Sequence, residues 1–275
     1  MSLLAVGVLG RGLVPPSEPV LHADDEALLR GRAAFETLRV YGGRPFRLAA
    51  HLDRLGLSAE RIGLPQLDSS GMAELAAETL AEAAEPDSVL RLFWTPGREG
   101  GDDPTGLALV STLPPGLEEE RAAGVRLAAI SGAGPRLLAG TKSTSYAEHL
   151  AARDEAQRRG ADDALLVADD GTVLEGPTAN VWWREGKCLV TPALELPLLA
   201  GVTRAALAGY APGLGYEVVE GTYGLERLRE ADEAFLSSSV REVMPVVALD
   251  DGPIPRGAAA AALQRALREE ACGGS

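Results

Sequence analysis

Apolar and polar positions alternate in several short runs of the first part of the chain, which is the pattern of half-buried strands. Such strands are predicted at residues 3–9, 34–41, 44–48, 88–95 and 105–112. A Gly-Gly turn joins the second run to the third, so these two form a hairpin. Apolar residues recur at helical spacing over 49–62 and 71–84, which predicts two helices among the strands. The first part therefore has an α+β pattern.

Short apolar runs joined by Asp-Gly and Glu-Gly turns dominate the second part of the chain. They predict strands at 125–130, 164–168, 173–174, 180–183, 188–191, 217–220, 234–236 and 245–249. Helical patterns are predicted at 145–159, 201–214, 225–229 and 256–271. Ser143 or Ser145 is expected to cap the first of these helices, and Gly160 to end it.

A stretch that contains Pro114-Pro115-Gly116 and then acidic residues separates these two parts. Such a composition is typical of a domain boundary. We therefore expect an N-terminal α+β domain over residues 1–113, an interdomain linker over 114–124 and a C-terminal domain over 125–275. Residues 11–23 are expected to form a loop, because three prolines interrupt them.

Composition and charge narrow the class of protein. Of the 275 residues, 46% are hydrophobic and 24% are charged, which fits a soluble globular protein. The formal net charge of −14 leaves no basic stripe of the kind that a nucleic-acid partner requires. No run approaches the length of a membrane span, and no leader segment is evident at the N-terminus, so we expect a cytoplasmic protein.

Histidine and cysteine are too few and too scattered to predict a metal site. The three histidines, His22, His51 and His149, show no ligand spacing. The two cysteines, Cys188 and Cys272, also lack such spacing and cannot form a disulfide framework. We therefore expect no bound metal.

Lysine is rare in this chain. Among 26 basic residues only Lys142 and Lys187 are lysines, and the others are arginines. A lysine can shift its pKa and form a Schiff base with a carbonyl group, which an arginine cannot do. Lys142 lies among small and hydroxyl-bearing residues, whereas Lys187 lies at a predicted hairpin tip. The simpler interpretation, that both are surface lysines, stays open on residue type alone.

Several other short motifs have the chemistry that a phosphorylated aldehyde cofactor requires. Lys142 offers an amine, and Glu175 offers a carboxylate for a ring nitrogen. The helix start at residues 201–203 and the serines at 237–239 offer donors for a phosphate, and Arg54 offers a charged contact. Each motif alone is also typical of an ordinary turn, a helix cap or a solvated arginine.

The order of these motifs resembles the class IV aminotransferase family, the fold-type IV pyridoxal-phosphate enzymes. The matching blocks are residues 31–39, 45–48, 51–55 with Ser58, 142–146, 175–176 with Asn180, 191–192, 199–204 and 237–246. The resemblance implies a two-domain fold of mixed α+β and α/β class, like that of D-amino-acid aminotransferase. In this fold, a small N-terminal α+β domain precedes a larger C-terminal domain with a β-barrel-like core. It also implies pyridoxal 5′-phosphate as the cofactor, a small-molecule amino substrate and a homodimer.

The resemblance implies a role for several individual residues. Lys142 resembles the Schiff-base lysine, which also carries the proton between the substrate and the cofactor. Glu175 resembles the partner of the pyridine nitrogen, with Asn180 in the same block. Leu199 resembles the apolar side chain that packs on the ring face. Tyr146 is similar to a tyrosine that binds the phenolic oxygen, although here it follows the lysine by four residues rather than five.

Phosphate and substrate contacts follow from the resemblance in the same way. The residues similar to those of the phosphate site are Arg54, Val202, Thr203 and Ser239. The backbone near Ser239 and Val240 is expected to meet the substrate carboxylate. Arg98, in a predicted loop, is a candidate for a second carboxylate of the substrate, and a solvated loop arginine is the alternative.

Within the family, two features favour 4-amino-4-deoxychorismate lyase of folate synthesis. Residues 35–39 and the compact length are more similar to this lyase than to branched-chain aminotransferases. Residues 91–93 lack the Arg-x-His pair of the usual D-amino-acid aminotransferase. A transaminase acting on branched-chain or D-amino acids is the first alternative. The second is a non-catalytic relative that acts as a binding protein.

Overall fold

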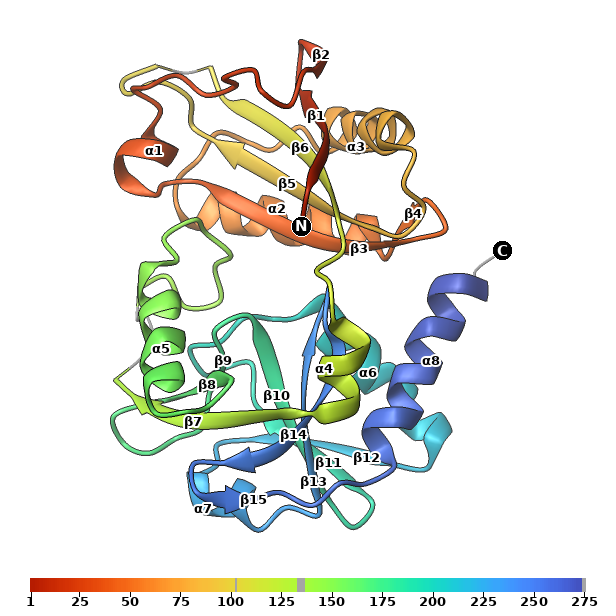
Figure 1. The fold of residues 1–275 in the computed structure, drawn as a ribbon. Coiled ribbons are helices and arrows are strands. Elements are labelled where there is room, and N and C mark those ends of the chain that lie inside the picture. The colour runs from red at the N-terminus through yellow and green to blue at the C-terminus, as the bar shows by residue number, and fades with distance from the viewer. Residues whose placement is uncertain (102, 133–136, 274–275) are drawn as a thin grey trace. The chain divides into compact units, whose positions relative to one another are not determined.

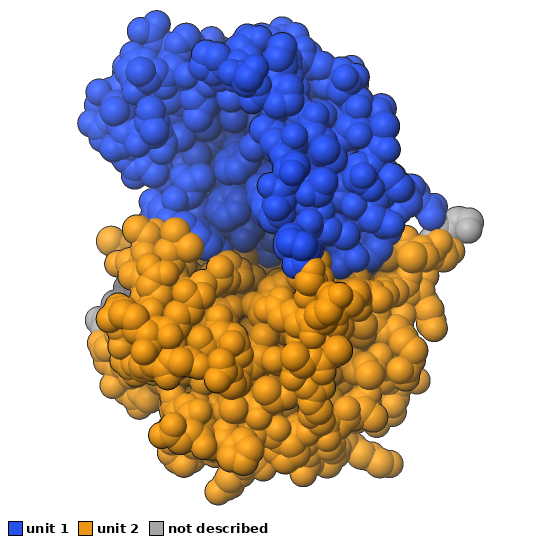
Figure 2. Space-filling model, in the orientation of Figure 1, with its two compact units in different colours: residues 1–115, 141–146 blue, residues 116–140, 147–275 orange. Residues whose placement is uncertain are grey.

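The computed structural model describes residues 1–101, 103–132 and 137–273. The chain forms two compact units, which Figure 2 distinguishes by colour. The first unit contains residues 1–115 and 141–146, and the second contains residues 116–140 and 147–275. Each unit has its own apolar core.

An antiparallel sheet of six strands, in the order β2-β1-β6-β5-β3-β4, forms the first unit. Its strands are β1 (Leu3–Val8), β2 (Gly12–Val14), β3 (Ala34–Tyr41), β4 (Arg44–Pro45), β5 (Ser88–Thr95) and β6 (Thr105–Thr112). Helices α2 (Leu48–Arg61) and α3 (Ser69–Ala83) cover one face of this sheet (Figure 1). The sheet and both helices share one apolar core, as the alternating pattern predicts.

The predicted helices and strands of the first unit are present, and two short elements were not predicted. Helix α1 (Glu26–Arg30) begins after Asp25, whose side chain accepts a hydrogen bond from the Ala27 N–H. Strand β2 lies within the predicted loop 11–23 and pairs with β1. Both elements are too short for a hydrophobic period to reveal them.

A mixed sheet of nine strands forms the second unit, with the path β12-β11-β10-β13-β14-β7-β8. Its strands are β7 (Val125–Ser131), β8 (Asp163–Val167), β9 (Glu175–Gly176), β10 (Ala179–Glu185), β11 (Cys188–Pro192), β12 (Glu217–Gly221), β13 (Glu233–Ser238), β14 (Glu242–Leu249) and β15 (Gly252–Pro253). The Leu174 N–H donates to the Leu166 carbonyl of β8, and β9, the next residues along the chain, pairs with β10. The sheet therefore curls back on itself, as expected for a barrel-like core.

Helices surround this sheet (Figure 1): α4 (Leu117–Ala123), α5 (Ala147–Arg158), α6 (Val202–Tyr210), α7 (Leu225–Arg229) and α8 (Ala259–Gly273), with the short 3-10 turn η1 (Pro212–Leu214). Helix α6 ends earlier than predicted, because Pro212 cannot continue the hydrogen-bond ladder. Helix α8 starts later than predicted, at Ala259. The Glu233 carboxylate caps it there by accepting hydrogen bonds from the Ala259 and Ala260 N–H groups.

The predicted linker over residues 114–124 contains α4, which belongs to the second unit. Residues 141–146, which include Lys142, group with the first unit although the prediction assigned them to the C-terminal domain. The predicted domain limits stay a prediction. Among the described residues, none of the helices has both the length and the apolar character needed to cross a membrane.

Candidate active site

Residues 141–146 run beside the start of β3 in the first unit. The Phe35 N–H donates to the Lys142 carbonyl at 3.0 Å, and the Thr144 N–H donates to the Ala33 carbonyl at 2.9 Å. The Lys142 N–H in turn donates to the Ser58 hydroxyl at 3.1 Å. The lysine is therefore held by the backbone of a sheet strand and by α2, which is a rigid base for a reactive side chain.

Two aromatic rings lie close to the Lys142 amine. Its Nζ atom is 4.5 Å from the ring centroid of Phe35 and 5.9 Å from that of Tyr146. The two rings meet edge to face, with centroids 5.5 Å apart. The structure thus brings Tyr146 and Lys142 together, as the resemblance implies. The predicted contact of Tyr146 with a cofactor stays a prediction.

Arg54 belongs to a buried cluster on the inner side of α2. Its Nε and Nη2 atoms donate to the two oxygens of Glu36, both at 2.7 Å. His51, one turn earlier on α2, contacts the same carboxylate through Nδ1 at 2.7 Å. Glu36 is fully buried, and His51 is only 1% exposed. The predicted phosphate-binding arginine is thus fixed by a two-point ion pair, which favours a single orientation.

Burial and charge set the protonation states in this cluster. Burial raises the pKa of Glu36, but the hydrogen bonds from Arg54 and His51 outweigh it and lower that pKa to about 2. Burial lowers the pKa of His51, and the nearby Arg54 and Lys142 charges act in the same direction against the pull of Glu36. Glu36 is therefore ionised at neutral pH, and His51 is a neutral ring that donates from Nδ1.

Glu175, in β9 of the second unit, is held from two sides. Its Oε2 atom accepts from Nδ2 of Asn180, and its Oε1 atom accepts from the Leu199 N–H, each at 3.0 Å. The Asn180 amide also donates to the Leu199 carbonyl at 2.8 Å. Three residues predicted from the sequence therefore come together, because the β9–β10 pairing places Glu175 opposite Asn180.

Helix α6 begins beside this group. Gly201 precedes it, and no side chain caps the helix start. A Cβ atom at Gly201 would lie 2.0 Å from Oδ1 of Asn180, so only glycine fits there. Val202 and Thr203 follow in the first turn and are buried. A helix start without a side-chain cap is a typical anion site. The phosphate contacts of these two residues stay a prediction.

The predicted serine-rich site lies at the end of β13. The buried Ser237 hydroxyl accepts a hydrogen bond from Nε1 of Trp182 at 3.0 Å. Ser239 and Val240 are half-buried and lie in the turn that leads into β14. Their predicted contacts with a phosphate and a substrate carboxylate remain predictions.

The two remaining candidates lie in exposed segments. Arg98, in the first unit, pairs with the Asp24 carboxylate at 3.0 Å, and both side chains are largely exposed. Its predicted contact with a substrate is untested. Lys187 is exposed at the β10–β11 turn, as expected for a surface lysine.

From the sequence, Arg54 was predicted to contact a phosphate, whereas its neighbour in the cluster, His51, was given no role. His51 and Arg54 are three apart on the predicted helix and share a face, which is a usable signal. Glu36 lies on β3, and only the packing of α2 against β3 in the folded chain brings it next to these two residues. Glu242, a buried acid in β14, was also missed, because one acidic residue in an apolar run has no periodic signature.

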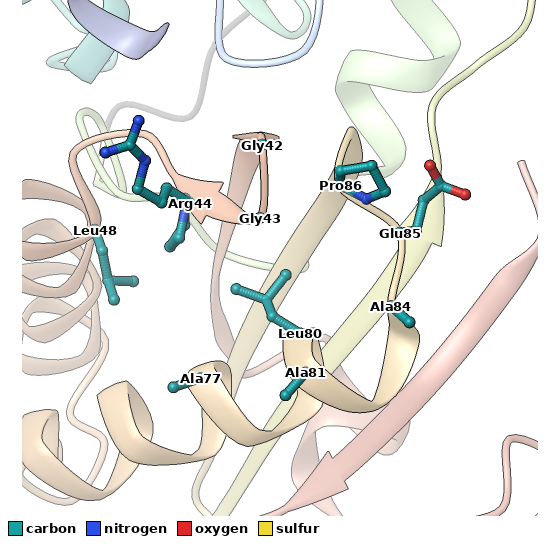
Figure 3. Close-up of a pocket in the computed structure, with 11 residues that line it drawn as sticks. Gly42, Gly43, Arg44, Leu48, Ala77, Leu80, Ala81, Ala84, Glu85 and Pro86 are labelled. Carbon is teal, nitrogen blue, oxygen red and sulfur yellow. The ribbon is translucent and has the colours of Figure 1, made fainter. Parts of the chain in front are cut away.

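A shallow groove of about 490 Å³ lies elsewhere in the first unit. Figure 3 shows it between the C-terminal part of α3 and the β3–β4 turn, with Leu80 and Leu48 among its apolar side chains. None of its lining residues is a predicted site residue. In the described part of the chain, we find no group of three or more histidine, cysteine or acidic side chains that could hold a metal ion.

The chain is similar to curated proteins over most of its length. It is 36% identical to a bifunctional aminodeoxychorismate lyase / D-amino acid transaminase of Mycobacterium tuberculosis, over 89% of this chain and 91% of that protein. It is 30% identical to an aminodeoxychorismate lyase of Bacillus subtilis, over 92% of this chain and 90% of that protein.

Solved structures agree with this likeness. A fold IV-transaminase from Curtobacterium pusillum matches with a TM-score of 0.90 and 34% identity, over 96% of this chain and 92% of that one. The PLP-bound form of a hypothetical aminotransferase from Mycobacterium tuberculosis matches with a TM-score of 0.91 and 33% identity, over 98% and 99%. These matches confirm the predicted two-domain fold. The family model described as amino-transferase class IV matches residues 33–249. The chain belongs to the class IV aminotransferases, a family of enzymes.

Proposed function

We propose that this chain is a pyridoxal-phosphate-dependent lyase that converts 4-amino-4-deoxychorismate into p-aminobenzoate and pyruvate, a step of folate synthesis. The observation that carries this choice is the pair of relatives named for the lyase, at 36% and 30% identity over about nine-tenths of the chain. The substrate class, a small amino acid or keto acid, follows from the family.

Pyridoxal phosphate is the cofactor of this chain, which the family and the PLP-bound relative support. The residues present fit such a group. The Glu175 carboxylate is fixed by Asn180 and Leu199, as a partner for a protonated ring nitrogen has to be. The start of α6 has no side-chain cap, so its first N–H groups suit a phosphate. Arg54 and Ser239 would add phosphate contacts, and Leu199 would pack on the ring.

When bound, the cofactor supplies an electron-withdrawing ring that weakens the C–H bond next to the substrate nitrogen. Lys142 would hold the cofactor aldehyde until the substrate amine replaces it, and its freed amine would then remove that proton. Glu175 would keep the ring nitrogen protonated throughout. The aromatic rings of Phe35 and Tyr146 flank the Lys142 amine, and they restrict where it can move.

The atoms balance in the proposed reaction without any second substrate. The proton leaves the ring carbon that bears the amino group, and the ether bond to the enolpyruvyl group breaks. The leaving group takes up a proton and is released as pyruvate. The remaining ring is aromatic p-aminobenzoate, whose stability drives the elimination.

A transaminase is the second candidate, because the M. tuberculosis relative is named for both activities and the structural relatives include a transaminase. In that reaction the amino group of a donor passes to a second substrate, a keto acid, and the donor leaves as a keto acid. A non-catalytic binding protein is the third, and it would bind no cofactor covalently.

A product assay tests the proposal. The PLP-loaded enzyme is given 4-amino-4-deoxychorismate without a keto acid, beside the Lys142→Ala variant. We expect p-aminobenzoate and pyruvate from the wild type and neither product from the variant. Products from both proteins, or from neither, would contradict the proposal. Conversion of the bound cofactor by L- or D-amino acids without these products would instead establish the transaminase.

We also propose that the protein is a homodimer, which rests on the family resemblance, and that it is cytoplasmic. Light scattering of the purified protein at micromolar concentration would give the mass of two chains if this is correct. A mass of about 28.6 kDa, that of one chain, would contradict the homodimer.

A further inference from the structure

The turn between β13 and β14 is followed by an acidic residue whose backbone conformation favours glycine. The last pair of the two strands is Ser238 with Glu242, so residues 239–241 form the turn. Glu242 has a φ of 56°. Glycine is the usual choice for a residue in this left-handed region, because it has no Cβ. A glutamate at this position suggests that its side chain has a function.

The Glu242 side chain is fully buried and heavily bonded. Its Oε2 atom accepts from Nη2 of Arg121 at 2.9 Å and from Nη2 of Arg268 at 2.8 Å. The Gln264 amide, also on α8, donates to the same oxygen at 2.5 Å. The end of the turn is therefore tied to α4 by Arg121 and to α8 by Arg268 and Gln264.

The same side chains hold the backbone on both sides of Glu242. Arg121 donates to the carbonyl of Arg241 at 2.9 Å and to that of Val243 at 3.2 Å. The Val243 N–H donates to Oε1 of Gln264 at 2.9 Å. One arginine thus contacts three consecutive residues, so that the turn cannot shift along the strand without breaking several bonds at once.

The charges around the carboxylate balance. Glu118, on α4, pairs with Arg121 at 2.7 Å and with Arg268 at 2.5 Å. Two carboxylates and two guanidinium groups therefore form a closed ring of ion pairs. This arrangement lets a buried carboxylate lie next to the turn without a net negative charge that would repel an anion.

We propose that Glu242 is a positioning residue, which together with Arg121 holds the β13–β14 turn so that Ser239 and Val240 meet the cofactor phosphate and the substrate carboxylate. This inference rests on the proposed function, because that function gives the turn its two anions. Sites of this kind depend on supporting residues that fix the groups in direct contact with the ligand. A glycine at position 242 would allow the same backbone conformation but would lose all the hydrogen bonds and ion pairs of the Glu242 side chain.

Binding of pyridoxal phosphate tests the role of Glu242 apart from activity. We would titrate the apo form of the wild type, Glu242→Gly, Glu242→Gln and Glu118→Gln with the cofactor and follow its absorbance and protein fluorescence. Glu118→Gln is the matched control, since it removes a charge from the same ring without touching the turn. Thermal unfolding of each variant shows whether it is folded.

For Glu242→Gly we expect cofactor affinity to fall about tenfold, which corresponds to roughly one hydrogen bond to a charged group. The KM for the amino substrate is expected to rise with it. The cofactor affinity of Glu242→Gln, which keeps the shape of the side chain, is expected to lie between those of the wild type and Glu242→Gly. Glu118→Gln is expected to bind the cofactor like the wild type. If both Glu242 variants fold and bind like the wild type, the inference is wrong. The inference is also wrong if the cofactor affinity falls equally in Glu118→Gln. The loss of affinity would then result from a less stable protein and not from a displaced turn. A wild type that does not bind the cofactor would instead overturn the proposed function, and this inference with it.

Discussion

Replacing Glu36 by glutamine would remove the negative charge that holds Arg54 and His51 in the first unit. Glutamine has the same shape but cannot balance the charge of Arg54, whose side chain is only 12% exposed. Breaking a buried pair by removing one charged partner typically costs about 3–5 kcal/mol, because the other charge is left uncompensated. We therefore expect a large loss of stability from a change of one atom.

The pKa of Glu36 gives an independent magnitude for this loss of stability. It is lowered from 4.5 to about 2 by the hydrogen bonds and charges of Arg54 and His51 against the opposing effect of burial. Each unit of pKa corresponds to about 1.4 kcal/mol, so the ionised form contributes about 3 kcal/mol at neutral pH. Because the folded-state pKa is the lower one, this stability is complete above about pH 5 and is lost as pH falls toward 2. At pH 3 it is less than half, about 1.4 kcal/mol.

Urea unfolding, followed by circular dichroism at pH 7 and at pH 3.5, measures the loss of stability and its dependence on pH. The difference in unfolding free energy between the wild type and Glu36→Gln should be about 3 kcal/mol at pH 7 and visibly smaller at pH 3.5. The pH dependence separates the lost charge from any general loss of packing, which would not change with pH.

Glu118 provides a matched control within the same protein. Arg121 and Arg268 outweigh the opposing burial effect and lower its pKa to about 2 as well, yet its side chain is 61% exposed. Solvent screens such a pair, so Glu118→Gln should cost less than about 1 kcal/mol. If the two variants cost the same, or if the Glu36 difference does not shrink at low pH, the reasoning from burial and charge fails.

Two further predictions concern the lysine and the glycine of the candidate site. Lys142→Ala should still bind pyridoxal phosphate, because the proposed phosphate contacts do not involve Lys142, but it should lose the adduct that borohydride fixes on the protein. Lys187→Ala should keep that adduct. An adduct that maps to Lys187 would place the site elsewhere. Gly201→Ala should destabilise the protein by about 1–3 kcal/mol in urea unfolding, because its Cβ would lie 2.0 Å from Oδ1 of Asn180. Gly209→Ala, in the same helix and without a neighbour within 4 Å of its Cβ, should instead stabilise it by about 0.5–1 kcal/mol. A stable Gly201→Ala variant would contradict the crowding that the structure shows.

The strands and long helices could be predicted because their apolar periods extend over many residues. The start of α5 shows where such patterns fail. The helix was expected from residue 145, with a serine as its cap, yet it starts at Ala147. The hydroxyls of Thr144 and Ser145 donate to the Gly31 carbonyl instead, and the segment pairs with the first unit. Tertiary contacts with a distant part of the chain therefore override the local cap signal.

The candidate site could be predicted only as separate motifs. Lys142, one of two lysines, and the Gly-x-Thr helix start could be recognised because rare residues and helix starts are local features. The pairing of Glu175 with Asn180 and Leu199, and of Glu36 with Arg54, depends on strand register and helix packing, which the sequence encodes only indirectly. The position of Glu242 depends in the same way on helices that follow it by some 20 residues or precede it by more than 100.

The stoichiometry of the reaction distinguishes a lyase from a transaminase. Dialysed enzyme loaded with pyridoxal phosphate is mixed with excess 4-amino-4-deoxychorismate, and p-aminobenzoate, pyruvate and the form of the cofactor are measured together over time. We expect many equivalents of both products in a one-to-one ratio, with the cofactor remaining as pyridoxal phosphate. At most one equivalent of a keto product, with pyridoxamine phosphate accumulating in equal amount, would contradict the lyase and establish a transaminase.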